Sequence, residues 1–307
     1  MAEWLYEAGI GEARAALVAD GRILKARIEL PGLRAGTIVQ GRLRAEGRVE
    51  WPGGAALLDR VPPGTAEGAA ITVRITREAI PEPGRAKLAR AAVTADPPAG
   101  GPDLYARIAA GGIPVRTCRA HEPDLLEAAG WSEVLEEALT GEIPFPGGVL
   151  RMAVTPAMTL FDVDGSLPPE PLAIAAATAA AQAIERHGIG GSIGIDFPTL
   201  GGKAARQAVA DAIDAALPQP FERTAVNGFG FLQIVRRRTR AALPELLSAD
   251  RAGAEARAEL RRIERLPPPL PDTHIVPARL LRRIAAEPGW TAALAQRMGR
   301  APQLVEG

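Results

Sequence analysis

The sequence predicts a protein of mixed α and β structure. A small β-barrel is expected in the N-terminal region, followed by an α/β domain with a mixed sheet and flanking helices. Short apolar runs between Gly and Pro turn signals dominate the first third of the chain. Helix and strand patterns then alternate in the middle of the chain. The 307 residues are enough for about two domains.

The barrel is expected within residues 1–95. Turn signals such as Asp20-Gly21 and Pro62-Pro63-Gly64 separate apolar runs that are too short for helices. Strands at this spacing are typical of a small antiparallel barrel or sheet. The predicted strands are Ala15–Val18, Ile23–Ile28, Gly36–Leu43, Ala55–Leu58 and Ile71–Ile75.

Residues 96–145 are expected to link the barrel to the next domain. This region opens with the Pro- and Gly-rich stretch Asp96–Pro102 and continues with a short helix over 103–110. A strand-like run, Ile113–Thr117, comes next. Ser132 then precedes an apolar-periodic stretch and is expected to cap a helix there.

Residues 146–245 show the clearest pattern, and residues 246–307 read as a charged helical tail. The middle region opens with two strands about a turn and continues as alternating helices and strands, which predicts a layered sheet with parallel neighbours. The predicted strands are Val149–Val154, Ala157–Val163, Ser192–Phe197 and Gly228–Val235, with helices over 171–187 and 203–217.

Composition excludes several classes of protein. The 36 basic and 36 acidic residues cancel, which argues against a uniformly basic nucleic-acid coat but leaves room for a local basic groove. The single cysteine, Cys118, excludes an internal disulfide framework and a zinc site built on several cysteines. The apolar run 172–184 is shorter than a membrane span, and the start resembles no secretory signal, so a cytoplasmic protein is expected.

Three aspartates stand at the ends of two successive predicted strands. Asp162 and Asp164 end one strand, and Asp196 ends the next, one helix later. In α/β sheets ligands gather at the carboxyl ends of strands, so these side chains converge if their strands are neighbours. Carboxylates with completing waters suit Mg²⁺ or Mn²⁺, which can activate water and neutralise charge on a phosphodiester. The competing interpretation is that these aspartates only terminate strands and favour turns.

A long stretch of the chain resembles the ribonuclease E/G family, in register. Gly147-Gly148, Thr155-Pro156-Ala157-Met158 and Asp162-Val163-Asp164 are similar to that family's glycine pair, turn and metal-binding strand. Weaker similarities precede these motifs, and the resemblance covers roughly residues 10–245. The further matching segments are Gly36–Arg42, Ile71–Arg90, Val115-Arg116-Thr117, Gly190–Phe197, Gly228–Gln233 and Arg236–Arg240.

The resemblance implies a Mg²⁺-dependent endoribonuclease that cleaves single-stranded RNA held by an OB-like barrel. Asp162 and Asp196 would coordinate the metal, with Asp164 as a third catalytic residue. Arg116 and Thr117 would bind a 5′-monophosphate, the Arg as a bidentate clamp. The products would carry 5′-phosphate and 3′-hydroxyl ends. Arg236 and Arg238, within the run that continues to Arg240, would contribute to a phosphate track, although such a charge run is more often a solvated face.

The chain departs from the family pattern at several positions. Asp164 stands where the family usually has Asn, and Pro156 replaces a Glu. The barrel is short, and the cysteines that join subunits through zinc are absent, so no zinc site is expected. The family's tetramer cannot be assumed, and a homo-oligomer stays open.

Two other functions compete with this interpretation. The run Leu160–Leu167 is similar to the first motif of haloacid-dehalogenase-type phosphatases, in which Asp162 would be the nucleophile and Asp164 the acid/base. That motif usually opens its fold and expects a later strand that ends in paired aspartates, whereas Asp211 and Asp214 fall in a predicted helix. The third hypothesis is an RNA-binding protein whose catalysis is impaired.

Overall fold

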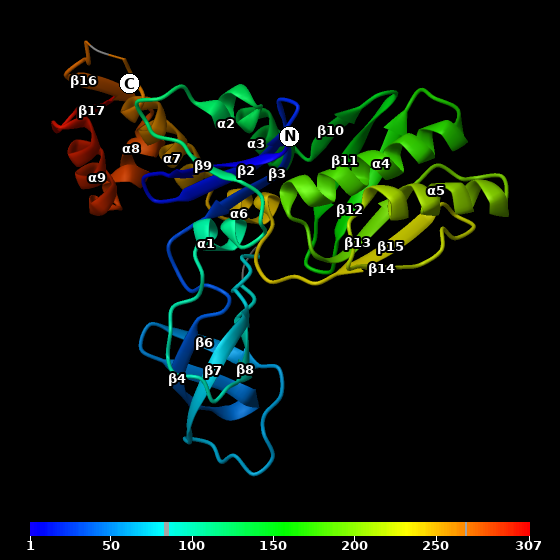
Figure 1. Cartoon of the computed structure of the whole chain (residues 1–307), viewed down its shortest axis with the longest axis horizontal. Coiled ribbons are helices and arrows are strands. Elements are labelled where there is room, and N and C mark those ends of the chain that lie inside the picture. Colours follow the sequence, from blue (N-terminus) through cyan, green and yellow to red (C-terminus); the bar gives the residue numbers. More distant parts are fainter. Residues whose placement is uncertain (83–85, 268) are drawn as a thin grey trace. The chain divides into compact units, whose positions relative to one another are not determined.

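The computed structural model describes residues 1–82, 86–267 and 269–307, and these divide into two compact units. One unit comprises residues 1–32, 104–131 and 247–307, and the other comprises residues 33–103 and 132–246. The first residues of the chain therefore fold with its last residues (Figure 1). This grouping differs from the sequence-based division at residues 95 and 245.

The first unit contains a four-stranded sheet in the order β3-β2-β1-β9. Strands β1 (Glu3–Ala8), β2 (Ala13–Ala19) and β3 (Arg22–Glu29) are antiparallel, and β9 (Val115–Thr117) pairs parallel to β1. Helix α1 (Leu104–Ala109) buries its apolar side chains against this sheet. The two strands predicted before residue 30 therefore exist but are not part of the barrel, because β2 pairs with β1 and β3 pairs with β2 in this separate sheet.

The C-terminal part of this unit is more than a helical tail. It also contains two short strands that pair in parallel, one between its helices and one after the last of them. Residues such as Leu260, Ile284 and Leu294 form a core that also includes Ile10. Apolar contact with Ile10 explains why this segment belongs with the N-terminal strands. The remaining elements of the first unit are α2 (Leu125–Ala128), α6 (Leu243–Ala249, across the unit boundary), α7 (Arg251–Glu264), β16 (Thr273–Val276), α8 (Ala278–Ala285), α9 (Pro288–Met298) and β17 (Gln303–Glu306).

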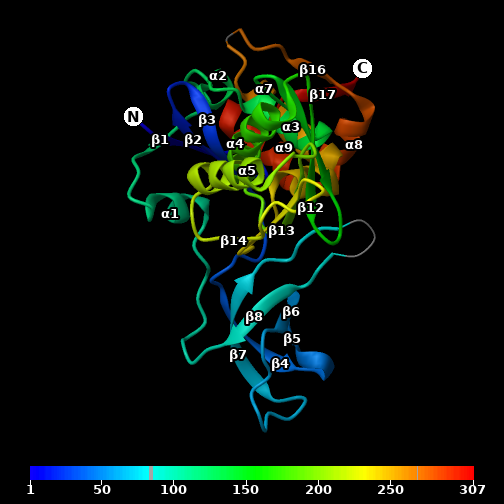
Figure 2. The same ribbon diagram turned by 90° about the vertical axis from the view of Figure 1, so that its right-hand side faces the viewer.

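The second unit contains the predicted barrel, which Figure 2 shows from a second direction. Five strands close in the order β4-β5-β6-β8-β7, with β4 paired to β7, and only β6 and β8 are parallel. Val49, Ala56 and Val73 are fully buried inside it. Residues 83–85, within the stretch that resembles the family's barrel, lie outside the described residues. The elements are β4 (Ile38–Leu43), the 3-10 turn η1 (Ala45–Gly47), β5 (Arg48–Trp51), β6 (Gly54–Leu58), β7 (Ala70–Arg77) and β8 (Ala89–Val93).

The same unit contains a six-stranded sheet in the order β10-β11-β12-β13-β15-β14. Only β12 and β13 are parallel, so the sheet is mixed, and the last predicted strand runs antiparallel to its neighbour rather than parallel. The strands are β10 (Glu142–Phe145), β11 (Gly148–Val154), β12 (Thr159–Gly165), β13 (Gly191–Asp196), β14 (Glu222–Arg223) and β15 (Phe231–Arg236).

Helices cover one face of this sheet (Figure 1). The helices of this region are α3 (Trp131–Thr140, across the unit boundary), α4 (Pro169–His187) and α5 (Lys203–Ala216). Helix α3 begins one residue before Ser132, so Ser132 lies in its first turn rather than at its cap. Phe161 and Ile195 point into the core under α4 and α5. The alternate residues of the same strands therefore face the opposite side.

No helix in the described part of the chain is long and apolar enough to cross a membrane. The longest is α4, with 19 residues, and its buried face is made largely of alanine.

Candidate metal and RNA site

Asp162 and Asp196 lie directly opposite each other on the two parallel strands β12 and β13. Both side chains are exposed, whereas Phe161, Val163 and Ile195 beside them are buried. This alternation places both carboxylates on the sheet face that α4 and α5 leave uncovered. Adjacent strands lie about 4.8 Å apart, so one bound ion can contact both side chains.

A pocket of about 460 Å³ contains the two aspartates. Leu160 and Phe231 lie on either side of Gly194, where a Cβ atom would come within 2.6 Å of the Phe231 ring and 2.8 Å of Leu160 Cδ2. The absence of a side chain at Gly194 therefore lets these two apolar groups form the floor of the pocket. The lining residues are Arg151, Met152, Ala153, Leu160, Phe161, Asp162, Asp196 and Phe231.

Arg151 is a pocket residue that the sequence interpretation missed. It pairs in register with Asp162 across β11 and β12, and its Nη1 lies 2.5 Å from Asp164 Oδ2. The available signal was a charged residue between the buried Leu150 and Met152, which indicates the open face of a strand. Arg151 therefore places a positive charge beside the aspartates and pairs with Asp164.

The donor set suits a hard cation with a partly hydrated shell. Within residues 1–82, 86–267 and 269–307, no three His, Cys, Asp or Glu side chains form a metal-binding group. Mg²⁺ keeps several waters and is commonly held by one or two carboxylates. Asp162 and Asp196 meet this requirement, because both are exposed in one pocket and neither forms an ion pair within the described part of the chain.

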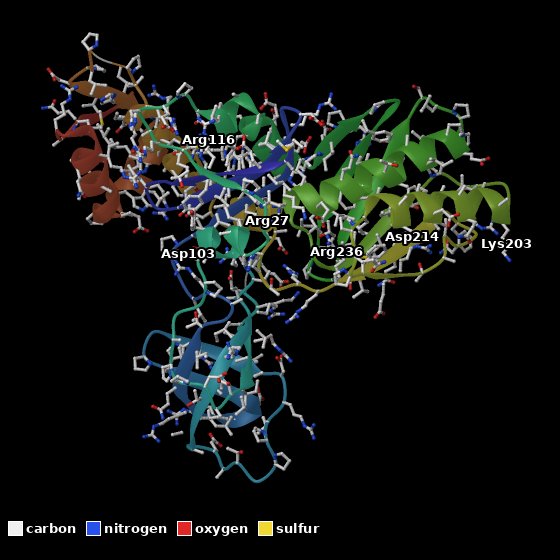
Figure 3. All side chains as sticks on the ribbon, viewed as in Figure 1. Arg27, Asp103, Arg116, Lys203, Asp214 and Arg236 are labelled. Carbon is white, nitrogen blue, oxygen red and sulfur yellow. The ribbon has the colours of Figure 1, made fainter. Side chains whose placement is uncertain are left out.

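Arg116 and Thr117 lie on β9, in the first unit rather than with the aspartates. Both side chains are exposed, and β9 places them opposite Leu5 and Tyr6 of β1 (Figure 3). The following residue, Cys118, is buried, and burial raises the pKa of its thiol. The exposed Arg-Thr pair thus has the residue types needed to bind an anion, on a strand that the sheet holds in place.

Arg236 and Arg238 are held in ion pairs within the protein. Arg236 Nη2 lies 2.6 Å from Glu185 Oε1, and Arg238 pairs with Glu245. All four side chains are mostly buried. Their charges therefore stabilise α4 and α6 against the end of the sheet, and a phosphate would compete with these partners.

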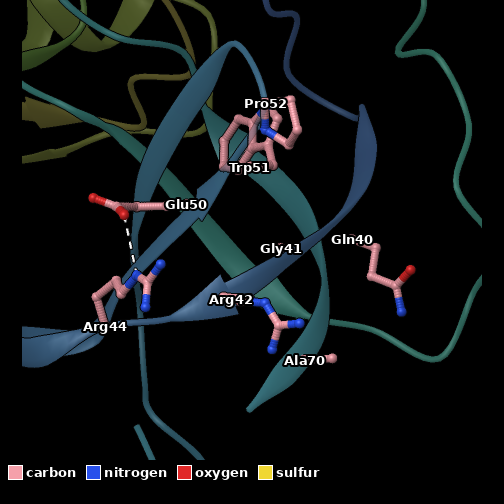
Figure 4. A pocket seen from close by; sticks show the side chains of 8 residues that line it. All are labelled: Gln40, Gly41, Arg42, Arg44, Glu50, Trp51, Pro52 and Ala70. Atoms are coloured by element: carbon pink, nitrogen blue, oxygen red, sulfur yellow. Dashed lines mark hydrogen bonds and ion pairs between the residues drawn. The ribbon is translucent and has the colours of Figure 1, made fainter. Parts of the chain in front are cut away.

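A second pocket, of about 590 Å³, lies on the barrel (Figure 4). Arg42 and Arg44 are exposed there, and Trp51 is half-buried beside them. Arg44 Nε donates to Glu50 Oε2 at 3.1 Å, and Arg42 Nη1 donates to the Gly68 carbonyl at 3.0 Å. This pocket combines two guanidinium groups with an aromatic ring, which is the chemistry that single-stranded nucleic acids bind. The lining residues are Gln40, Gly41, Arg42, Arg44, Glu50, Trp51, Pro52 and Ala70.

Asp211 and Asp214, the carboxylates considered for the phosphatase hypothesis, lie on α5. This helix packs through Val209, Ala210 and Ile213 against the covered face of the sheet, opposite the face that carries Asp162. Asp214 is paired with Arg223, whose hydrogen bond holds the pKa of that carboxyl below its ordinary value.

Comparisons with protein families and with curated proteins found no relative of this chain. No family model matches the chain. A search of curated proteins found no match either. Function is therefore inferred from the geometry and chemistry of the pocket that holds Asp162 and Asp196.

Proposed function

We propose that this chain is a Mg²⁺-dependent endoribonuclease, of the type that its motifs resemble, which cleaves single-stranded RNA. One observation carries the proposal: Asp162 and Asp196 face each other across β12 and β13 on the open face of the sheet. Two exposed carboxylates in register are a costly arrangement, because like charges repel, unless a cation lies between them.

Asp162 and Asp196 would hold the metal, which when bound supplies charge neutralisation at the phosphodiester and lowers the pKa of water. Arg151, on the neighbouring strand, would orient a phosphate oxygen through its guanidinium fork. The ion pair with Arg151 would keep the Asp164 carboxylate from repelling the RNA backbone.

The barrel would bind the rest of the RNA. Its strand order, closed through β4 and β7 with one parallel pair, is consistent with an OB-like barrel, a fold that commonly binds oligonucleotides. Arg42, Arg44 and Trp51 offer phosphate contacts and a ring for stacking. Arg116 and Thr117 would bind the 5′-monophosphate end, with Arg116 as the bidentate group.

The decisive experiment uses a 5′-monophosphorylated, A/U-rich single-stranded RNA with Mg²⁺ or EDTA. The protein is compared with its Asp196→Asn and Asp162→Asn variants, which keep the shape of the side chain and remove its charge. We expect metal-dependent cutting by the parent protein and a loss of about a hundred- to a thousandfold in either variant, as for removal of a charge-stabilising group from an active site.

Other outcomes identify the alternatives. RNA binding without cutting in Mg²⁺ or Mn²⁺ would favour the RNA-binding protein without catalysis. Turnover of small phosphomonoesters without any effect on RNA would favour the phosphatase.

A further inference from the structure

Phe229 is the most exposed aromatic side chain among the exposed large hydrophobic residues of the described chain, at 86%. It lies in the turn between β14 and β15. A free phenyl ring in water forgoes the stabilisation that burial would give. Its apolar face is available to a partner.

The turn that carries Phe229 is held in place by several hydrogen bonds. Asn227 Oδ1 accepts from the backbone N–H groups of Phe229, at 2.9 Å, and Phe231, at 3.0 Å. The next residue, Gly230, has φ +92°, and a Cβ there would lie 2.3 Å from the Phe197 carbonyl oxygen. The Gly230 carbonyl also accepts from Phe197 N–H at 3.1 Å. The ring is therefore presented to solvent by a defined turn.

The same turn lies at the proposed site. Phe231, two residues further on, pairs in register with Asp196 and lines the pocket that contains both aspartates. Consecutive Cα atoms are about 3.8 Å apart, so the Cα of Phe229 lies within about 7.6 Å of that of Phe231. The turn that carries the exposed ring therefore leads directly into the strand residue that lies opposite Asp196 and lines the pocket.

We propose that Phe229 is a base-stacking residue that fixes the nucleotide next to the scissile phosphodiester. The inference rests on the proposed function and goes beyond it, because it assigns the substrate contact that sets the register of the RNA. A phenyl ring stacks on every base, so it selects unpaired nucleotides without selecting a sequence. A base within a duplex is already stacked and is not available to the ring, which makes Phe229 a determinant of single-strand specificity.

The test compares Phe229→Ala, Phe229→Leu and Phe229→Trp. Loss of one stacked base weakens the binding of single-stranded RNA by about 5- to 150-fold, so we expect this loss in the Ala and Leu variants and binding near the parent level in the Trp variant. A role in folding alone would show no such rescue by an aromatic residue. Leu24→Ala, which removes another exposed apolar side chain at 46% exposure, is the matched control. Thermal unfolding of each variant checks that the fold is intact.

A second readout does not depend on cleavage. RNA that carries 2-aminopurine at single positions is bound to Asp196→Asn protein, with and without Phe229→Ala. Stacking on the ring changes the fluorescence at one position beside the cleavage site, and the change is lost in the double variant. If the change persists without Phe229, the inference is wrong.

The outcomes separate the inference from the proposed function. Cutting by the parent protein with unaltered RNA affinity in Phe229→Ala overturns the stacking role and leaves the nuclease in place. If the parent protein neither binds nor cuts RNA, both proposals fail. A change in solution mass in Phe229→Ala, with RNA binding unaltered, would show that the ring contacts a second protein chain instead.

Discussion

Arg151 and Asp164 form an ion pair across β11 and β12, with Nη1 2.5 Å from Oδ2, on the sheet face that also carries Asp162. The Asp164 carboxylate would otherwise add a third negative charge to the proposed site. Arg151 offsets that charge. The two positions are therefore expected to act as a unit.

Arg151→Ala tests this coupling. Without the guanidinium, the Asp164 carboxylate repels the RNA phosphate, and we expect kcat/KM to fall about tenfold. Arg151→Ala combined with Asp164→Asn should recover most of that loss, because the unpaired charge is gone. Both side chains are about half exposed, so unfolding free energy should change by less than about 1 kcal/mol. A double variant no more active than Arg151→Ala would contradict the coupling.

Arg42→Ala in the barrel pocket should weaken RNA binding and reduce its dependence on salt. Each phosphate contact contributes about 0.7 to the slope of log K against log salt for a single strand. We expect the slope measured by titration at several salt concentrations to fall by about that amount. Arg22→Ala, an exposed Arg of β3 in the other unit, should leave the slope unchanged. An equal change in both variants would argue against a barrel site.

Arg14→Met should destabilise the first unit. Arg14 is 1% exposed and bonds Glu7, at 2.9 Å, and Asp124, at 2.6 Å. Removal of one partner of a buried ion pair costs about 3–5 kcal/mol, and because Arg265 also pairs with Glu7 we expect about 3 kcal/mol in urea unfolding. Arg90→Ala, which breaks the exposed pair with Asp59, should cost less than about 1 kcal/mol.

Glu137 should make the stability of the second unit fall as the pH is lowered into the acidic range. Burial alone would raise its pKa, but the hydrogen bond from His187 and the charge of Arg186 hold the pKa below its ordinary value. A carboxyl with a lowered folded-state pKa stabilises above its unfolded pKa and loses that contribution as pH falls through the folded pKa. Glu137→Gln should therefore be less stable than the parent at pH 7, and the two stabilities should converge below about pH 4. Parallel curves over that range would contradict this role.

Much of the fold follows from local pattern. The strands around Ile38, Ile71 and Phe161 and the helices α4 and α5 lie within a few residues of their predicted positions, because apolar periodicity and Gly or Pro turns act over short distances. Which strands pair with one another is harder to predict from the sequence. The sequence predicts β2 and β3 as barrel strands, but β3 pairs with β2 and β2 pairs with β1, which in turn pairs with β9 more than a hundred residues later.

The candidate site was also only partly predictable, because its contacts join residues that are distant in the sequence. Asp162 and Asp196 could be selected because each lies next to the end of a predicted apolar strand, and their convergence followed once β12 and β13 were neighbours. The expected strand end at Asp162 is wrong, because β12 continues to Gly165. Arg151 and Trp51 were missed: the alternation around Arg151 indicates only that it faces the open side of its strand, and nothing local distinguishes Trp51 from other tryptophans. The ion pair of Arg236 with Glu185 joins residues 51 positions apart, so no local pattern reveals it.

The sequence by itself determined where most strands and helices form and which aspartates belong to apolar strands, because backbone preference and hydrophobic alternation depend on near neighbours. The tertiary structure alone decided that Asp162 faces Asp196, that Arg151 pairs with Asp164, and that Phe229 remains in solvent. These relationships depend on strand register and on which face α4 and α5 cover. Register is set by the packing of a whole layer, in which one residue of slip would turn every side chain to the other face.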